Sequence, residues 1–300
     1  MKNKLHQKWT LEEILLEIFN VVFMTCFVTI TVYPVLNTIA ISFNDGIDAV
    51  RGGIYLWPRV FTLKNYRTVF HMENLITGAK ISVLRTVIGS VSALFVNALL
   101  AFVVSRKNFL FRSQLSLFWL ITMYVNGGLI PTFLLYRNLK LTGTFWVYVV
   151  PGMVSAWNML VIRTFMEGIP DSLEESAQLD GAGSMTIFFK IISPLCKPVY
   201  ATILLFIAVY QWNSWFDAMI YNRLKTQYTT LQYELMKLLS SVMQQSGSAA
   251  SARNNAQAAS VTPVTIRAAA SVVTMVPIIC LYPFLQQYFQ TGLTIGGVKG

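Results

Sequence analysis

Residues 170–198 read PDSLEESAQLDGAGSMTIFFKIISPLCKP, a polar segment that turns apolar halfway along. Ser172 and Glu175 have the spacing of a capping box, in which each side chain bonds the backbone of the other residue, so a helix is expected to begin here. It should run to about Asp180, because Gly181 can adopt the positive φ that ends a helix. The first half of the segment therefore predicts a short helix followed by a sharp bend.

The second half predicts another short helix with one apolar face. It starts near Ser184, and Pro194 stops it. Its apolar residues recur at i, i+3, i+4 and i+7, namely Met185, Phe188, Phe189 and Ile192. An exposed apolar stripe on so short a helix needs a partner. The residues alone leave open whether that partner is another protein, the rest of the chain or the membrane interface.

Long apolar runs on either side of this segment indicate a membrane protein. The chain has 300 residues, of which 55% are hydrophobic and 12% are charged, whereas a soluble domain carries roughly 25% charged residues. A run of about 20 apolar residues spans a bilayer as a helix, and a helix satisfies its own backbone there. We therefore predict an all-α membrane domain over 18–289 with six spans, at about 18–43, 81–104, 115–136, 144–165, 199–221 and 264–289.

Polar stretches connect the expected spans. Residues 1–17 precede the first span, and the loop 44–80 holds aromatic and proline residues and should be partly folded. The loop 222–262 includes the Ser-, Ala-, Gln- and Asn-rich stretch 244–260, which has the composition of a flexible linker. Prolines inside the apolar runs predict simple curvature in preference to hinges: Pro34, Pro131, Pro151 and Pro277.

The net charge of +10 comes from basic residues scattered through the connecting segments. Because they form no dense patch, anionic lipid headgroups are the expected partners and nucleic acid is not. The cations are nearly balanced between the two faces, and only the short loop 105–114 favours a cytoplasmic N-terminus. The three cysteines have neither metal-ligand nor disulfide spacing.

The segment 170–198 resembles the EAA loop of ABC-importer permeases. That pattern is Glu-Ala-Ala, two residues, Asp-Gly-Ala, five residues, Phe, two, Ile, two, Pro, three and Pro, and the chain follows it without gaps except for Ser176 in place of Ala. The resemblance implies a type I ABC-importer permease fold with cytoplasmic coupling helices in the loop 167–198. The residues that it implies for ATPase docking are Glu175, Ala177, Asp180, Gly181, Ala182, Phe188, Ile191 and Pro194.

Two further stretches carry the resemblance. The C-terminal GLTIGGVKG at 292–300 is similar to the tail of maltose-type permeases, which implies a cytoplasmic tail over 290–300 that contacts the ATPase through Gly296, Gly297 and Lys299. NGGLIP at 126–131 and SAWN at 155–158 resemble the LplC-like subgroup of carbohydrate permeases. The subgroup suggests an oligosaccharide or polysaccharide fragment as substrate, acidic ones included, without naming the sugar.

The chain has no GxxxxGK[ST] phosphate loop, so we expect it to be a transport subunit and not an enzyme. No cofactor is expected on this chain; ATP and Mg would bind a partner ATPase dimer. The resemblance also implies a second homologous permease subunit and an extracytoplasmic solute-binding (lipo)protein. It places the chain in a bacterial cell membrane, with both termini in the cytoplasm and the loop 222–262 outside.

The expected span 199–221 contains QWNSWFD at 211–217. Polar groups inside a membrane helix are costly and often functional, and aromatic faces beside amides and carboxylates suit sugars. The favoured alternative is an interfacial aromatic belt with ordinary helix–helix bonds. Candidates for the substrate pathway are Trp212, Asn213, Trp215, Asp217, Asn126 and Asn158. Snorkelling explains the cations near span ends, which are Arg85, Arg163 and Arg267.

Three other functions would each require features that can be looked for in the sequence. A secondary transporter or channel predicts paired ionisable residues near the midplane or inverted repeats, and neither is visible in the sequence. A membrane enzyme needs convergent acid, base or metal-ligand groups, and two isolated histidines do not supply them. An ABC permease for peptide or another non-sugar solute is disfavoured only by the tail and the subgroup motifs.

Overall fold

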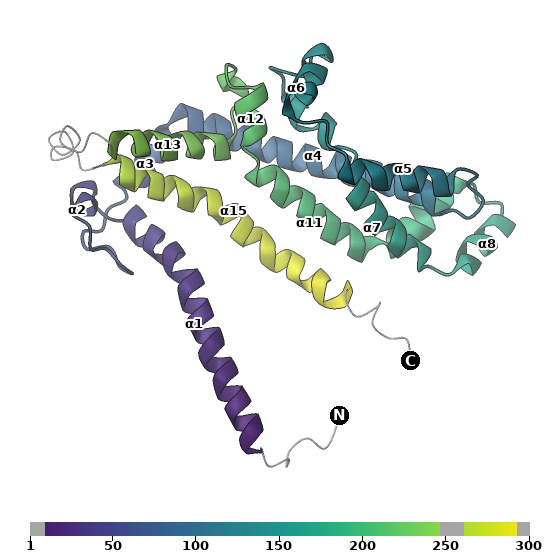
Figure 1. Ribbon diagram of the computed structural model, residues 1–300, viewed down its shortest axis with the longest axis horizontal. Coiled ribbons are helices and arrows are strands. Elements are labelled where there is room, and N and C mark those ends of the chain that lie inside the picture. The colour runs from purple at the N-terminus through teal and green to yellow at the C-terminus, as the bar shows by residue number, and fades with distance from the viewer. Residues whose placement is uncertain (1–9, 247–260, 293–300) are drawn as a thin grey trace. The chain divides into compact units, whose positions relative to one another are not determined.

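The structure is a computed structural model that describes residues 10–246 and 261–292 (Figure 1). Within these ranges every regular element is a helix, and the only β-pairing is an isolated bridge between Asn44 and Phe61. The all-α prediction is therefore confirmed. The chain divides into two compact units, one from residues 1–69 and 239–273 and the other from 70–238 and 274–300, and each is described by itself.

The first unit begins with the long helix α1, Leu11–Ser42. It starts seven residues before the expected span because Thr10 and Glu13 form a reciprocal capping box, with bonds of 2.8 and 3.3 Å. After α1 come α2, Gly46–Val50, and α3, Lys64–His71. The buried Asn65 amide donates to the carbonyls of Ser42 and Asn44, so the loop 44–80 is folded as expected.

The described part of the expected loop 222–262 is helical over much of its length. The 3-10 turn η4, Thr226–Tyr228, precedes α13, Leu231–Ser246, and α15, Pro263–Gly292, follows. The linker prediction for 244–260 is corrected at its start, because α13 continues to Ser246; residues 247–260 lie outside the described ranges.

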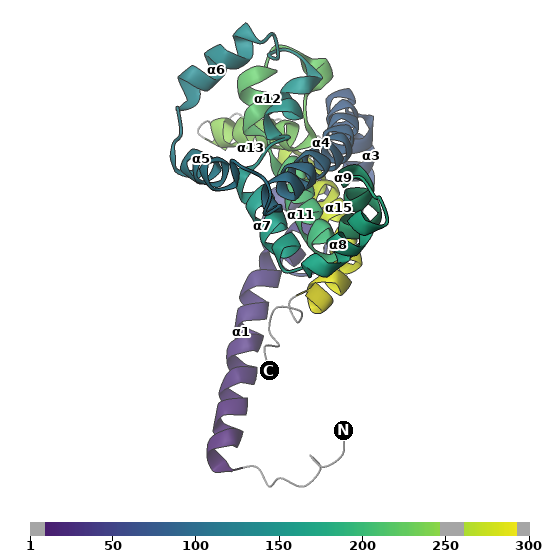
Figure 2. The same ribbon diagram turned by 90° about the vertical axis from the view of Figure 1, so that its right-hand side faces the viewer.

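Three helices form the centre of the second unit: α4, Glu73–Ser105, α7, Ala156–Glu167, and α11, Lys197–Asn213. They lie side by side in both views (Figures 1 and 2). Small residues on α4 let the helices approach closely: a Cβ on Gly89 would lie 2.7 Å from the Gln211 amide nitrogen.

Three expected spans are broken, and this corrects the prediction of single helices. The span 115–136 divides into α5, Arg112–Tyr124, and α6, Leu129–Asn138, which meet at 116°. Gly128 takes a φ of +85° at the break, a backbone conformation that glycine adopts without strain. Pro131 fits the first turn of α6, where a missing N–H costs no helical bond.

The other two bent regions lie at 144–165 and 199–221. The first opens with the 3-10 turns η1, Phe145–Tyr148, and η2, Val150–Gly152, and meets α7 at 44°. The second is α11, a break at Ser214 and Trp215, and the short α12, Phe216–Tyr221. Among the described residues three helices are long and apolar enough to cross a membrane. The number is six if each bent pair counts as one span, and the third such pair is Ser184–Leu195 with α11, which meet at 81°.

Candidate functional site

The bend that the sequence predicted after Asp180 is formed. Helix α8, Asp171–Leu179, ends in a Schellman arrangement, because the Ala182 N–H donates to the Ala177 carbonyl at 2.9 Å and the Gly181 N–H to that of Gln178 at 3.0 Å. Gly181 has a φ of +80°. The expected capping box is wrong, because the N-cap of α8 is Pro170, two residues before Ser172, and makes no side-chain cap.

We call α8 and the helical turns after the bend the bracket, with α8 as its first arm. Its second arm consists of α9, Ser184–Ile187, η3, Phe188–Ile192, and α10, Ser193–Leu195. The apolar stripe expected there divides between two environments. Phe188 and Ile192 are each 2% exposed in the core of the second unit, where the Phe188 ring lies 5.1 Å from that of Phe102. Met185 and Phe189 face outward and are more than half exposed. Packing on the rest of the chain is therefore confirmed for Phe188 and Ile192, whereas Met185 and Phe189 are not covered by the described residues.

The exposed face of the bracket combines charge with apolar surface. Glu175, Asp180, Gly181 and Pro194 are exposed, whereas Ala182 and Ile191 are half-buried and Ala177 is buried. Leu179, which the sequence did not single out, is 90% exposed directly before the bend.

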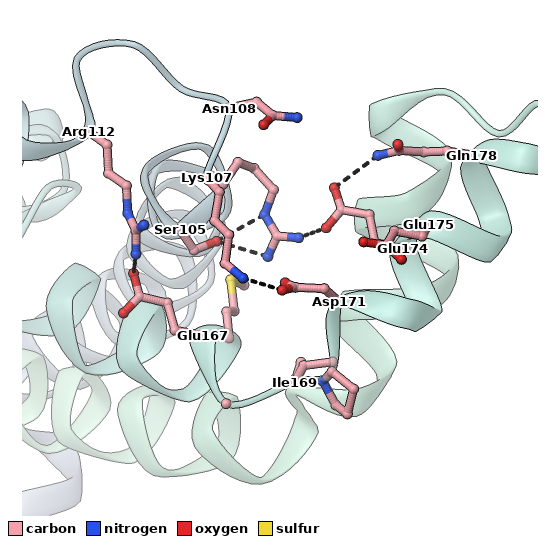
Figure 3. A pocket seen from close by; sticks show the side chains of 14 residues that line it. Ser105, Lys107, Asn108, Arg112, Glu167, Ile169, Asp171, Glu174, Glu175 and Gln178 are labelled. Atoms are coloured by element: carbon pink, nitrogen blue, oxygen red, sulfur yellow. Dashed lines mark hydrogen bonds and ion pairs between the residues drawn. The ribbon is translucent and has the colours of Figure 1, made fainter.

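Ion pairs fasten this bracket to the loop between α4 and α5 (Figure 3). Arg106 pairs with Glu174, and Lys107 pairs with Asp171, both on α8. Arg112, at the start of α5, donates to Glu167 at 2.5 Å. These residues line a polar cavity of about 600 Å³. The loop that supplied the strongest charge signal in the sequence thus holds α8 in place.

At neutral pH the carboxyl groups of Asp171 and Glu167 are charged, which favours their ion pairs with Lys107 and Arg112. The hydrogen bond from Lys107 holds the pKa of Asp171 below its ordinary value. Burial raises the pKa of Glu167, but hydrogen bonds from Arg163 and Arg112 outweigh it and lower that pKa overall. Since both pKa values are depressed on folding, the pairs stabilise the site above the ordinary carboxyl pKa and lose this contribution as pH falls through the lowered values.

The two α8 pairs should differ in strength. Arg106 and Glu174 are 21% and 18% exposed, whereas Lys107 and Asp171 are 72% and 56% exposed. We expect Arg106→Ala to lower the free energy of unfolding by about 1.5–3 kcal/mol, as for a charged hydrogen bond, and Lys107→Ala to lower it much less, because exposed ion pairs contribute little to stability. Thermal unfolding of the detergent-purified protein measures both; equal losses would contradict this ranking.

A second polar site lies on α4, α11 and α12. Arg85 is 1% exposed and donates to Gln211 Oε1 from Nε and Nη2, at 3.0 and 2.8 Å. It also pairs with both oxygens of Asp217, at 3.2 and 2.5 Å. The expectation that Arg85 snorkels is therefore wrong, because its charge is neutralised inside the protein by a residue 132 positions away.

The structure places the candidate pathway residues in different surroundings. Trp212 is buried and donates to the Thr274 carbonyl at 3.0 Å, an ordinary helix–helix bond. Asn213 is exposed and bonds only its own helix, and Trp215 is half-buried against Phe216. A cavity of about 320 Å³ lies beside Arg85 and Gln211, and of the candidates in 211–217 only Asp217 lines it.

Asn126 and Asn158 lie apart from that cavity. Asn126 accepts the Gly128 N–H at the α5–α6 break, and the half-buried Asn158 donates its backbone N–H to Ser155. Gly296, Gly297 and Lys299 lie outside the described residues. In the described part of the chain no group of three or more His, Cys, Asp or Glu side chains is placed to hold a metal ion.

Comparisons with known proteins agree on one family. Residues 85–295 match the family described as "Binding-protein-dependent transport system inner membrane component". The permease YtcP of a polygalacturonan/rhamnogalacturonan transport system of Bacillus subtilis is 34% identical, covering 93% of this chain and 96% of YtcP. Protein LplC of the same organism is 32% identical, covering 95% of each chain.

A solved structure agrees in fold. It is a crystal structure of a bacterial ABC transporter involved in the import of the acidic polysaccharide alginate, of which one chain superposes with a TM-score of 0.84 at 28% identity. The match covers 95% of this chain and 100% of that chain.

Proposed function

Because the chain belongs to the family of binding-protein-dependent transport system inner membrane components, we propose that it is the subunit through which an ATP-driven importer moves a carbohydrate across the membrane. The observation that carries the proposal is the likeness, over nearly the whole chain, to permeases of saccharide importers. The substrate is an oligosaccharide or polysaccharide fragment. A non-sugar solute such as a peptide is the alternative.

The α8–α10 bracket is the site where the ATPase docks. Its exposed residues are Glu175, Asp180, Leu179, Met185 and Phe189, which offer charge at the rim and apolar surface at the bend. Phe188 and Ile192 instead fix the bracket to the bundle from inside. We therefore leave Phe188 out of the docking surface and assign it the transfer of force into α4, through Phe102.

The bracket lies on the cytoplasmic side, together with both termini. The support is the positive-inside rule: Arg106, Lys107 and Arg112 crowd a short loop, and all three pair with residues at the bracket's base. The C-terminal residues Gly296, Gly297 and Lys299 then reach the ATPase from the same side.

The mechanism is alternating access biased by nucleotide. ATP binding closes two ATPase subunits, and each draws its docked bracket inward. The ion pairs to the α4–α5 loop and the apolar contact to α4 make the bracket and the bundle move together. The other permease subunit supplies the second half of the pathway, and a solute-binding protein delivers the saccharide from outside.

Transport by the reconstituted complex tests this function. The chain, its partner permease, the ATPase and the solute-binding protein are assembled in liposomes, and the uptake of labelled trigalacturonate, arabinotriose and a tripeptide is measured. We expect uptake of at least one saccharide that requires ATP and stops with an ATPase inactive in hydrolysis. Uptake of the tripeptide alone, or uptake driven by an ion gradient without ATP, would refute the proposal.

A further inference from the structure

A second cavity, of about 320 Å³, lies between α4, α6, η1, η2, α11 and α12 in the second unit. Arg85, Gln211 and Asp217 line one side of it. Along α11, Gln211 lies roughly 20 Å from the bracket end at Lys197, at 1.5 Å per residue. The cavity is thus separate from the docking site, and its volume is at the lower end of the roughly 300–1,000 Å³ of small-molecule sites.

The charges at this cavity cancel. The guanidinium of Arg85 donates to Gln211, Asp217 and the Ser214 carbonyl. Its Cζ atom lies 4.4 Å from the centroid of the Tyr148 ring. The Asp217 carboxylate accepts both arms of that guanidinium and is 22% exposed. No other charged residue lines the cavity. Its wall is therefore neutral overall, and the part that reaches the open space is the carboxylate.

Three tyrosines supply the polar groups that remain available. Tyr136, Tyr210 and Tyr221 line the cavity, and their hydroxyls have no hydrogen-bond partner among the residues that the structure describes. Tyr148 differs, because its hydroxyl donates to the Tyr228 carbonyl. Tyrosine combines an apolar face with a hydroxyl that both donates and accepts, which matches the alternating C–H faces and hydroxyls of a sugar ring.

We infer that this cavity binds a short portion of the transported saccharide through uncharged groups, with Tyr136, Tyr210 and Tyr221 as its contacts. The inference rests on the proposed function. The Arg85–Asp217 pair is a positioning element, which ties the α11–α12 break to α4 and so holds Tyr210 and Tyr221 on either side of that break.

Charge neutrality makes the inference specific. A sugar carboxylate placed here would face the partly exposed Asp217 oxygens, while the guanidinium behind them is already occupied. Like charges at short distance repel even in a polar medium. The cavity therefore favours the uncharged face of a ring, and any preference of the importer for acidic sugars arises elsewhere.

Protection of an introduced cysteine tests the site in the intact complex. Cys26, Cys196 and Cys280 are replaced by serine or alanine, and Tyr210→Cys is compared with Asn213→Cys, which lies three residues along α11, is exposed and does not line the cavity. The rate of maleimide labelling is measured with and without trigalacturonate, arabinotriose and galactotriose, the last being the carboxyl-reduced form of the first.

We expect the imported saccharide to slow labelling of Tyr210→Cys by about fivefold or more, because such pockets bury most of a ligand's surface, and to leave Asn213→Cys within twofold. Galactotriose should protect at least as well as trigalacturonate. Tyr221→Cys repeats the test where Tyr210→Cys disturbs folding.

Unchanged labelling at both tyrosine positions in a complex that still imports the saccharide would overturn the inference while the proposed function stands. Stronger protection by trigalacturonate than by galactotriose would contradict the claim that the cavity favours uncharged parts of the saccharide. Protection of Asn213→Cys alone would move the site out of the cavity. Tyr210→Cys that reacts only after lipid is removed would assign the space to an acyl chain.

Discussion

Arg85→Leu is expected to lower the free energy of unfolding of the permease by about 3–5 kcal/mol, because it leaves the Asp217 carboxylate without its buried partner. The change also removes both donors to the Gln211 carbonyl oxygen. Gln211 holds η1 through the Tyr148 carbonyl, so the loss spreads to three elements. Thermal unfolding of the purified protein in detergent, together with its yield in membranes, measures the effect.

The matched control removes both charges. In Arg85→Met with Asp217→Asn no ion is left unpaired, and replacement of a whole buried pair by groups of similar volume is often neutral. We expect the double variant to lose less than half as much stability as Arg85→Leu. If both variants unfold at the same temperature, the charge of Asp217 is not what the arginine compensates.

Gly181→Val is expected to reduce ATP-driven uptake about tenfold or more. The residue has a φ of +80°, where L-residues are strained by roughly 1–2 kcal/mol and β-branched ones by more, and about 1.4 kcal/mol is a factor of ten in a population. No atom lies within 4 Å of a Cβ built on Gly181, so the effect comes from the backbone of the bend and not from a clash.

Gly183→Val provides the control within the same bend. Gly183 has a φ of −73° and a ψ of 161° and open space around its Cβ position, so valine fits there without strain. We expect near-normal uptake from Gly183→Val and an intermediate value from Gly181→Asn, since asparagine tolerates positive φ. Normal uptake by Gly181→Val, with the protein present in the membrane at ordinary levels, would count against force transfer through this bend.

The bracket was the part of the site that the sequence could predict, because its determinants are local. The bend depends on Gly181, and Gly183 precedes the second arm. The prediction that Pro194 stops that arm is wrong, because Pro194 lies in the first turn of α10, which continues to Leu195. The gapless match to the EAA pattern implies, in addition, that the binding partner of this segment is an ATPase. Which face of the second arm points outward was not predictable, since Phe188 and Phe189 are adjacent apolar residues and only the position of Phe102 on α4 decides between them.

The broken spans were misread for a related reason. Hydropathy is averaged over a window of residues and does not respond to the backbone conformation of a single residue. NGGLIP at 126–131 is therefore counted as part of an apolar run. The glycine pair Gly127–Gly128 in front of Pro131 is the sequence signal for the 116° bend. The length of the apolar run, in contrast, predicts one continuous span.

By itself the sequence determined that the chain is helical, that it belongs in a membrane and where its bracket bends, because composition, apolar run length and glycine φ preference act over a few residues. Only the tertiary structure decided that Arg85 is buried and that Tyr136, Tyr210 and Tyr221 share a cavity. These are pairings between distant helices, and their energy exists only once packing has removed water from the groups concerned.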